Sequence, residues 1–374
     1  MNTHQVELKP IREVAIYKRN LIPAKIPENY ELKPIFKDIA HEETIRNGVV
    51  AFRDFLYIFF DRLITDGHLY AKPPKSSSGM ADYPFLNNIT NIMVEIGYYG
   101  KLTENSDSLL ITEMPLCTAQ IDENGKRKPL KIPVTGQIEC LRFLTLCGFH
   151  FTGVDLDAKL LTVSLKKPLE VSYPNKPVLL MGLKAMSIAD MELRAGRRYW
   201  NDHNLLRCDY RLIKAEDTAI TDIFEDFIHP LSVEVQEFAL KLHNRCIDMG
   251  MTCTLNVWDD VSFSYAHIRK SRRELSSRDK YQQRAWAFSY SMRNGYCLFV
   301  RAKKIEKYAD VIKNFNLQLQ EKIAQGYGCY RKMGRERCQG DCQGICIPLD
   351  DSILRISKDI ELWLDNEVPM HLLH

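Results

Sequence analysis

Four of the eleven cysteines lie close together near the end of the chain, in the stretch GYGCYRKMGRERCQGDCQGIC (residues 326–346). Their spacing is C-x8-C-x3-C-x3-C. Structural zinc sites use cysteine pairs about two to four residues apart, so the x3 gaps fit such a site and the x8 gap is unusual. Gly340 and Gly344 disfavour a helix and favour tight turns around an ion. The candidate metal ligands are Cys329, Cys338, Cys342 and Cys346.

Three interpretations of these thiols stay open. Four thiolates around Zn²⁺ carry a net charge of −2, which Arg331, Lys332, Arg335 and Arg337 would offset. The same basic surroundings would activate redox thiols, and the cysteines could also be unligated. Few apolar side chains lie in the stretch, so burial alone would not order it. We therefore expect one structural Zn²⁺ with no ligand position left for water.

A basic cluster occupies residues 269–284. Seven basic and two acidic side chains leave a local charge of +5, above the +3 of the whole chain. One interpretation is a solvated hairpin loop, and the other is a contact surface for nucleic acid or another polyanion. Nucleic acid is not favoured, since Tyr281 alone could stack on a base. The basic residues are Arg269, Lys270, Arg272, Arg273, Arg278, Lys280 and Arg284.

Catalytic motifs are missing from the sequence. It contains no GxxxxGK[ST] phosphate loop, no GxSxG, no HExxH and no GxGxxG after a strand. His203 and Asp209 could form an acid–base pair, although ordinary polar residues on a loop and a strand are the better interpretation. His243 is expected to be a packed or surface histidine. These features favour a protein that is not an enzyme.

The composition is that of a soluble globular protein. Of the 374 residues, 45% are hydrophobic and 26% are charged. The apolar stretches are too short to cross a membrane, and the N-terminus lacks the apolar segment of a secretory signal, so we expect a cytoplasmic protein without a membrane partner. An odd number of cysteines then indicates thiols or metal ligands rather than disulfides.

The sequence patterns around these residues predict an α+β fold in three parts. Residues 1–79 form an N-terminal helical region with an apolar stripe (Ile45, Val49, Phe52, Phe55, Leu56, Phe59) and a linker, KPPKSSSG. Residues 80–226 form a duplicated helix–hairpin domain. Residues 227–374 form a C-terminal α+β domain that contains the cysteine-rich segment.

The duplication is read from two stretches with one plan, residues 85–112 and 136–164. Each has an apolar-periodic helix, a glycine, an aromatic pair, a polar turn and an aliphatic strand, which is 160–163 in the second copy. Gly97 and Gly148 are expected to end their helices in the left-handed conformation. Residues 238–266, with Gly250, form a fainter third copy. Such helix–hairpin units occur in many unrelated folds.

Two further elements flank the cysteine-rich segment. Residues 286–300 alternate between large and small side chains around Asn294-Gly295, which predicts a β-hairpin. The last helix is expected to be capped by Asp350 or Asp351. Its apolar stripe is Ile353, Ile356, Ile360 and Trp363.

A resemblance adds to this interpretation. The runs DYPFLNNITNIMVEIGYYGKLTENSDSLL, LKLHNRCIDMGMTC, LQEKIAQGYGC and LDDSILRISKDIELWLDNE resemble a group of uncharacterised proteins from Firmicutes-type bacteria, from about Asp82 onward. The resemblance implies a bacterial cytosolic setting, and it assigns no catalytic residues.

The leading functional hypothesis is a binding or sensing protein that does not catalyse a reaction, in which helix–hairpin units recognise a small molecule or a protein partner. The first alternative is an enzyme whose site lies in a cleft between domains, assembled from residues far apart in sequence. The second is a nucleic-acid-binding protein that uses residues 269–284, with the repeats as winged helices.

Overall fold

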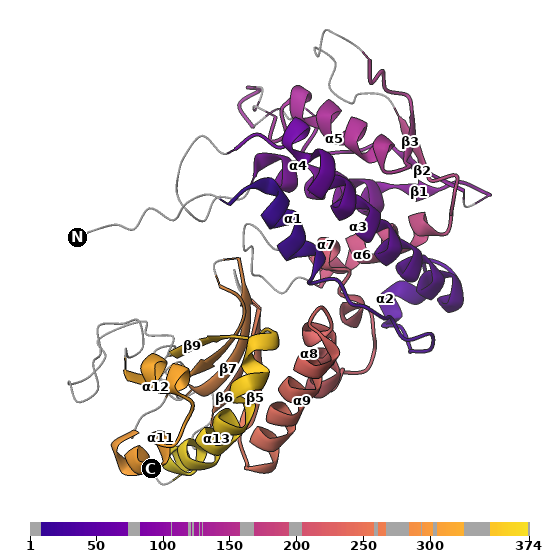
Figure 1. Ribbon diagram of the computed structural model, residues 1–374. Coiled ribbons are helices and arrows are strands. Elements are labelled where there is room, and N and C mark those ends of the chain that lie inside the picture. Colours follow the sequence, from indigo (N-terminus) through magenta and orange to yellow (C-terminus); the bar gives the residue numbers. More distant parts are fainter. Residues whose placement is uncertain are drawn as a thin grey trace. The chain divides into compact units, whose positions relative to one another are not determined.

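The computed structural model shows an α+β protein, with helices and two antiparallel sheets (Figure 1). It describes residues 9–73, 83–105, 107–118, 121, 123–126, 128, 130–157, 168–193, 204–257, 261–266, 284–292, 294–301, 305–324 and 345–372. The chain divides into two compact units, Met1–Asp217 and Thr218–His374, and each is described by itself. Within these ranges no helix has both the length and the apolar character needed to cross a membrane.

The first unit is built around a helix that is buried on nearly all sides. Helix α6 carries ten buried residues among its fourteen and packs against both α3 and α4. A helix that is apolar all round belongs in the interior, which explains why α6 lacks a polar stripe. The helices of this unit are α1 (Ile11–Arg19), α2 (Pro34–Lys37), α3 (Glu42–Tyr70), α4 (Pro84–Tyr99), α5 (Val134–Leu146), α6 (Leu179–Glu192), α7 (Asn204–Arg207) and the 3₁₀ helix η1 (Tyr210–Leu212).

Two glycines set how closely α3 and α6 approach. A Cβ atom placed on Gly48 would lie 2.6 Å from the backbone nitrogen of Gly182 and 2.8 Å from the carbonyl oxygen of Val178. The backbones therefore touch where neither residue has a side chain. The predicted stripe of α3 is buried around this crossing, since all six of its apolar residues are at most 1% exposed.

A four-stranded antiparallel sheet completes the first unit. Its order is β1-β2-β4-β3, and Leu109 pairs with Val171 at its centre. The hairpin β1–β2 follows α4, and β3 follows α5 and pairs with β4. The predicted strand 160–163 lies outside the described residues. The strands are β1 (Lys101–Leu102), β2 (Ser108–Ile111), β3 (His150–Thr152) and β4 (Leu169–Ser172).

The predicted equivalence of Gly97 and Gly148 is wrong. Gly148 follows α5 with a φ of 103°, as expected for a left-handed helix end. Gly97 instead lies inside α4, which continues to Tyr99 and ends at Gly100 with a φ of −64°. Its role is one of contact: a Cβ atom on Gly97 would lie 2.6 Å from the carbonyl oxygen of Leu183 on α6. Close helix packing, rather than helix termination, requires this glycine.

The domain boundaries also differ from the expected ones. The linker near residue 79 does not separate two compact units, because α3 packs with α6 and α5 in the first unit and α1 packs on α3. The division falls at Thr218, before α8, rather than at residue 227. Apolar periodicity identifies the buried face of a helix but not the helices that pack against it. It therefore does not show that the helices before and after residue 79 share one core.

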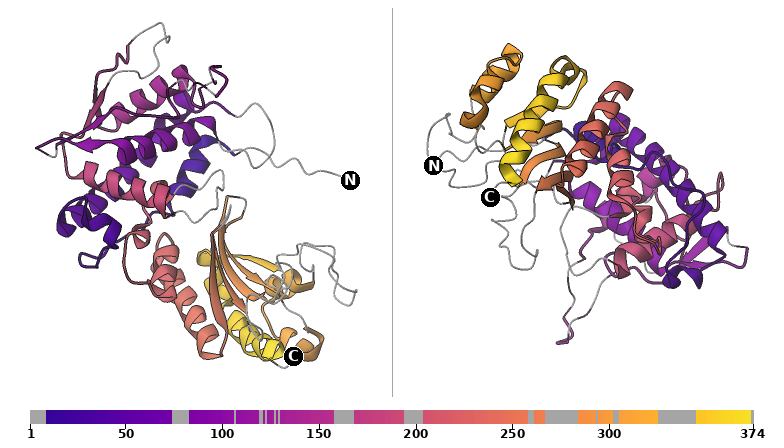
Figure 2. Two further views of the ribbon diagram at one scale, coloured as in Figure 1. Left: turned by 180° about the vertical axis from the view of Figure 1, so that it is seen from behind. Right: turned by 90° about the horizontal axis from the view of Figure 1, so that it is seen from below.

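The second unit holds a five-stranded antiparallel sheet in the order β5-β6-β7-β8-β9. Figures 1 and 2 show it beside helices α8, α9 and α13. Its strands are β5 (Thr252–Val257), β6 (Val261–Ala266), β7 (Arg284–Ser291), β8 (Gly295–Val300) and β9 (Ile345–Pro348). Its helices are α8 (Ile220–Ile228), α9 (Val233–Asp248), η2 (Ile305–Tyr308), α11 (Ala309–Ile312), α12 (Leu317–Ala324), η3 (Asp351–Ile356) and α13 (Ser357–Leu372).

The two faces of this sheet differ in chemistry because side chains alternate along each strand. One face is aromatic and packs on the helices: Phe224 of α8 contacts Phe263 and Phe288, and Trp363 of α13 contacts Trp286. The opposite face carries small and polar residues. In register across β5 to β8 these are Asn256, Ser262, Ser289 and Cys297, and in the next row Thr254, Ser264 and Ala287, with the larger Phe299 beside them.

The predicted elements around the cysteine-rich segment are confirmed. Strands β7 and β8 form the expected hairpin, and Gly295 has a φ of 64° at its turn. Asp350 is the cap: its side chain accepts a hydrogen bond from the backbone nitrogen of Ser352 at 2.9 Å. The capped segment begins as the 3₁₀ helix η3 and continues as α13, and the four residues of its apolar stripe are buried.

We predict that Gly182→Ala lowers the free energy of unfolding by about 3 kcal/mol or more, because a methyl group would have to enter the backbone of α3. Gly136→Ala on α5 is the matched control. Its Cβ atom would meet the side-chain nitrogen of Asn88 at 3.0 Å, and that side chain can rotate away. Chemical denaturation should show a loss below about 1 kcal/mol for the control. Equal losses for the two variants would contradict the proposed role of the crossing.

Candidate thiol site

Two cysteine sulfurs lie in contact on the face of the five-stranded sheet that carries the small and polar residues. Cys297 lies on β8 and Cys346 on the edge strand β9. Phe299 pairs with Cys346 and Cys297 pairs with Pro348, so the two cysteines are diagonal neighbours on one face. Their Sγ atoms are 3.1 Å apart and share a hydrogen bond. Both strands are held by backbone pairing, which fixes the positions of the two thiols.

The surroundings of the two thiols are unequal. Cys297 is 1% exposed and packs with Ala287 and Phe299, whereas Cys346 is half-buried at the margin of this cluster. The hydrogen bond between the two thiols lowers the pKa of Cys346, burial opposes this shift, and the nearby ammonium group of Lys322 supports it. The same hydrogen bond, together with burial, raises the pKa of Cys297. The half-buried position of Cys346 and the charge of Lys322 distinguish it from the enclosed Cys297.

This pair includes one residue that the sequence predicted and one that it missed. Cys346 was expected in a turn around an ion, and it lies instead in a strand. The other three predicted ligands, Cys329, Cys338 and Cys342, lie outside the described residues. The sequence does not single out Cys297, because the alternation of Tyr296, Leu298 and Val300 indicates the opposite face of the hairpin. One sequence signal could have identified it. Cys297 lies between Tyr296 and Leu298 in the predicted hairpin, so its side chain must lie on the other face of the strand.

The sulfur separation bears on what the pair can hold. Zinc–sulfur bonds of about 2.3 Å in a tetrahedron place the sulfurs roughly 3.8 Å apart. The observed 3.1 Å is shorter than this, and it is longer than the 2.05 Å or so of a disulfide. In the described ranges no group of three or more histidine, cysteine, aspartate or glutamate side chains is arranged to bind a metal ion. Thiols from the rest of the cysteine-rich segment would have to complete a metal site.

Most of the other sequence-predicted residues have no described position. His203 and the basic residues Arg269, Lys270, Arg272, Arg273, Arg278 and Lys280 lie outside the described residues. Arg284 begins β7. Asp209 accepts a hydrogen bond from Nε of Arg211 at 2.5 Å.

His243 is a packed histidine, as one of the two expectations had it. It is 0% exposed, and its ring stacks on Phe224 with centroids 4.5 Å apart. Its Nε2 lies 3.1 Å from the Thr221 hydroxyl, and its Nδ1 lies 2.6 Å from the Tyr265 hydroxyl. Burial lowers the pKa of His243. Both ring nitrogens are thus used to join α8, α9 and β6, which indicates a structural role.

A buried carboxyl group in the first unit also has a perturbed pKa. Glu95 on α4 is 4% exposed, and its Oε1 accepts a hydrogen bond from the backbone nitrogen of Leu116 at 2.8 Å. Burial raises its pKa from 4.5 to about 7, against the effects of the Leu116 nitrogen, the Cys117 thiol and Lys131. Glu95 and Cys117 are both enclosed, so this cluster anchors a loop to α4 and offers no surface to a substrate.

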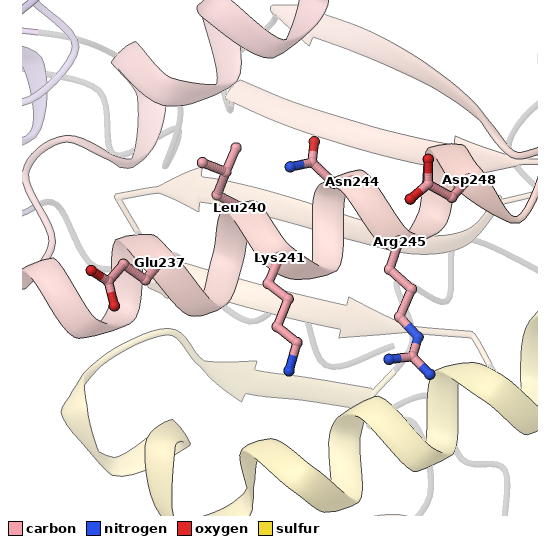
Figure 3. A pocket seen from close by; sticks show the side chains of 6 residues that line it. All are labelled: Glu237, Leu240, Lys241, Asn244, Arg245 and Asp248. Carbon is pink, nitrogen blue, oxygen red and sulfur yellow. The ribbon is translucent and has the colours of Figure 1, made fainter.

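Figure 3 shows an open groove along α9, lined by Glu237, Leu240, Lys241, Asn244, Arg245 and Asp248. Lys241 and Arg245 point toward helix α13, drawn in yellow. Lys241 forms an ion pair with Glu361 at 2.7 Å, and Arg245 forms one with Asp365 at 2.5 Å. These pairs join α9 to α13. The cations of the groove are thus already used within the fold, and the groove carries no catalytic constellation.

Comparisons with protein-family models, curated proteins and solved structures found no match to this chain. The thiol pair is the candidate site because its two sulfurs are in contact and one of its cysteines is half-buried rather than enclosed.

We predict that the unfolding free energy falls by roughly 3 kcal/mol as the pH rises from 4.5 to 7 because of Glu95. The folded state raises the pKa of this acid, so it favours the neutral form, and the stabilisation present at low pH is lost as the carboxyl group ionises. Glu95→Gln should remove this fall, measured as the difference between variant and wild type in urea denaturation at several pH values.

Glu104→Gln is the control for this prediction, because Glu104 is exposed after β1. It should keep the pH dependence of the wild type. If Glu95→Gln also keeps it, then Glu95 does not titrate in this range.

Proposed function

We propose that this protein is a binding or sensing protein that does not catalyse a reaction, and that the thiols of its C-terminal unit are its responsive element. The observation that carries this proposal is the pair of sulfurs 3.1 Å apart on strands β8 and β9 of the five-stranded sheet. Two titratable groups with shifted pKa values, Glu95 and His243, are enclosed in the fold and hydrogen-bonded there. Their placement supports a structural rather than a catalytic use.

Within this proposal, a structural Zn²⁺ is held by Cys346 together with Cys329, Cys338 and Cys342. Cys346 supports the proposal because its strand supplies a fixed ligand, and Lys322 brings a positive charge beside it that favours the thiolate. When bound, the ion would cross-link the segment to the sheet. A site of four thiolates has no position for water, so it would stabilise the fold without activating a nucleophile.

We predict about one zinc per chain in protein purified without chelator, and the loss of that zinc in Cys338→Ser. Elemental analysis measures both. The decisive comparison is Cys297→Ser against Cys329→Ser, because the x8 gap makes Cys329 the weakest of the four assignments. Zinc retained by the Cys297 variant and lost by the Cys329 variant supports the proposed ligands. The reverse result replaces Cys329 with Cys297, and zinc-free wild type overturns the metal site.

Cobalt substitution tests the absence of an open coordination position. The visible absorption bands of Co²⁺ in a closed thiolate site should not change when azide is added, because azide can bind only at a free position. A shift of these bands on addition of azide would indicate an open site and would favour an enzyme over the proposed function.

A further inference from the structure

We propose that Cys297 and Cys346 are a reversible oxidation site, at which a peroxide converts the two thiols into a disulfide that locks the edge strand β9 onto β8. This goes beyond the proposed binding function and beyond the proposed metal site. It rests on two described residues and needs no other cysteine of the segment.

Geometry is the first argument. The two sulfurs lie 3.1 Å apart, so about 1 Å of approach separates them from a disulfide bond. The two cysteines belong to adjacent strands and share one face. β9 has four residues, is the last strand of the sheet, and pairs with β8. Among the described strands β9 has no second neighbour, so it can shift by this small distance without disturbing another of them.

Exposure assigns the two roles. Cys346 is half-buried, so a small oxidant can reach it, while Cys297 at 1% exposure is shielded from solvent. Redox-active cysteines are accessible thiols that lie next to a second, resolving thiol. Cys346 fits the first role and Cys297 the second.

The reaction balances with hydrogen peroxide as the oxidant. The sulfur of Cys346 attacks one peroxide oxygen, the O–O bond breaks, and one water leaves, so that Cys346 becomes a sulfenic acid. The sulfur of Cys297 then attacks the sulfur of Cys346. The S–S bond forms, the S–O bond breaks, and the hydroxyl group leaves as a second water with the proton of the Cys297 thiol. The two thiols lose two electrons and two protons, and a dithiol reductant restores them.

The consequence is mechanical. A bond between residues 49 positions apart in the chain would close a covalent loop that contains α11 and α12 and ends at β9. Such a cross-link restricts the unfolded chain and holds the edge strand in register. Oxidation would thereby fix the strand that leads into η3 and the C-terminal helix.

The test uses the full chain, hydrogen peroxide as the probe, and mass spectrometry. After treatment, remaining thiols are blocked with N-ethylmaleimide and the protein is digested without reductant. We expect a peptide that contains Cys297 joined to one that contains Cys346, and we expect dithiothreitol to separate them. The bond should be absent from Cys346→Ala and from Cys297→Ala, and it should persist in Cys253→Ala, which removes a half-buried thiol from the opposite edge strand.

Unfolding in urea supplies a second readout for the wild type alone, so the proposal does not depend on variants that fold. Oxidation should raise the urea midpoint, and dithiothreitol should return it. Two results would overturn the proposal: a bond from Cys346 to another cysteine of the segment, or an overoxidised Cys346 beside an N-ethylmaleimide-labelled Cys297.

Zinc content is measured on the same samples, before and after treatment with a chelator, to keep the two proposals apart. A bond in zinc-free protein as purified overturns the metal site and supports the oxidation site. A bond that forms after zinc removal alone supports the oxidation site and shows that the ion protects it. Zinc without a bond in either sample overturns the oxidation site and leaves the metal site in place.

Discussion

The pairing of β8 with β9 determines what the thiols of the C-terminal unit can do. The side chains of a strand alternate between faces, so a shift of one residue in this pairing would move Cys346 to the aromatic face and away from Cys297. The register is held because the aromatic face is filled by α8, α9 and α13, and Ile345 and Ile347 of β9 belong to that face. Apolar packing on one side of the sheet thus positions the chemistry on the other.

The first unit shows the same dependence on close packing, without exposed chemistry. The glycines at the crossing of α3 with α6 let a helix without a polar stripe sit in the interior. Buried polar side chains of this unit form hydrogen bonds. Glu95 accepts one from the Leu116 backbone nitrogen, and Gln137 donates to the carbonyl oxygens of Cys117 and Ile132. A shifted pKa in such surroundings reports the cost of enclosing a carboxyl group and does not by itself indicate catalysis.

Local pattern predicted the local structure well. The stripe of α3, the β7–β8 hairpin and the Asp350 cap each depend on residues a few positions apart, and each was read from the sequence. The errors concern long-range contacts. Gly97 has the same sequence context as Gly148, but it serves a neighbouring helix that is remote in the chain. Cys297 is likewise separated from Cys346 by 49 positions, and only a strand pairing that the spacing of cysteines does not encode brings the two together.

Metal ligation and disulfide formation exclude each other at Cys346. A thiolate bound to zinc donates the electron pair that would otherwise attack a peroxide, and a disulfide sulfur has no thiolate left to offer a metal. The observed sulfur separation lies between the two geometries, so neither state requires a large movement of β9. If both proposals hold, the two states compete for one sulfur on one edge strand. Oxidation would then release the ion from Cys346 and join β9 to β8 by a covalent bond. A change in redox conditions would thus exchange a metal cross-link in the C-terminal unit for a disulfide.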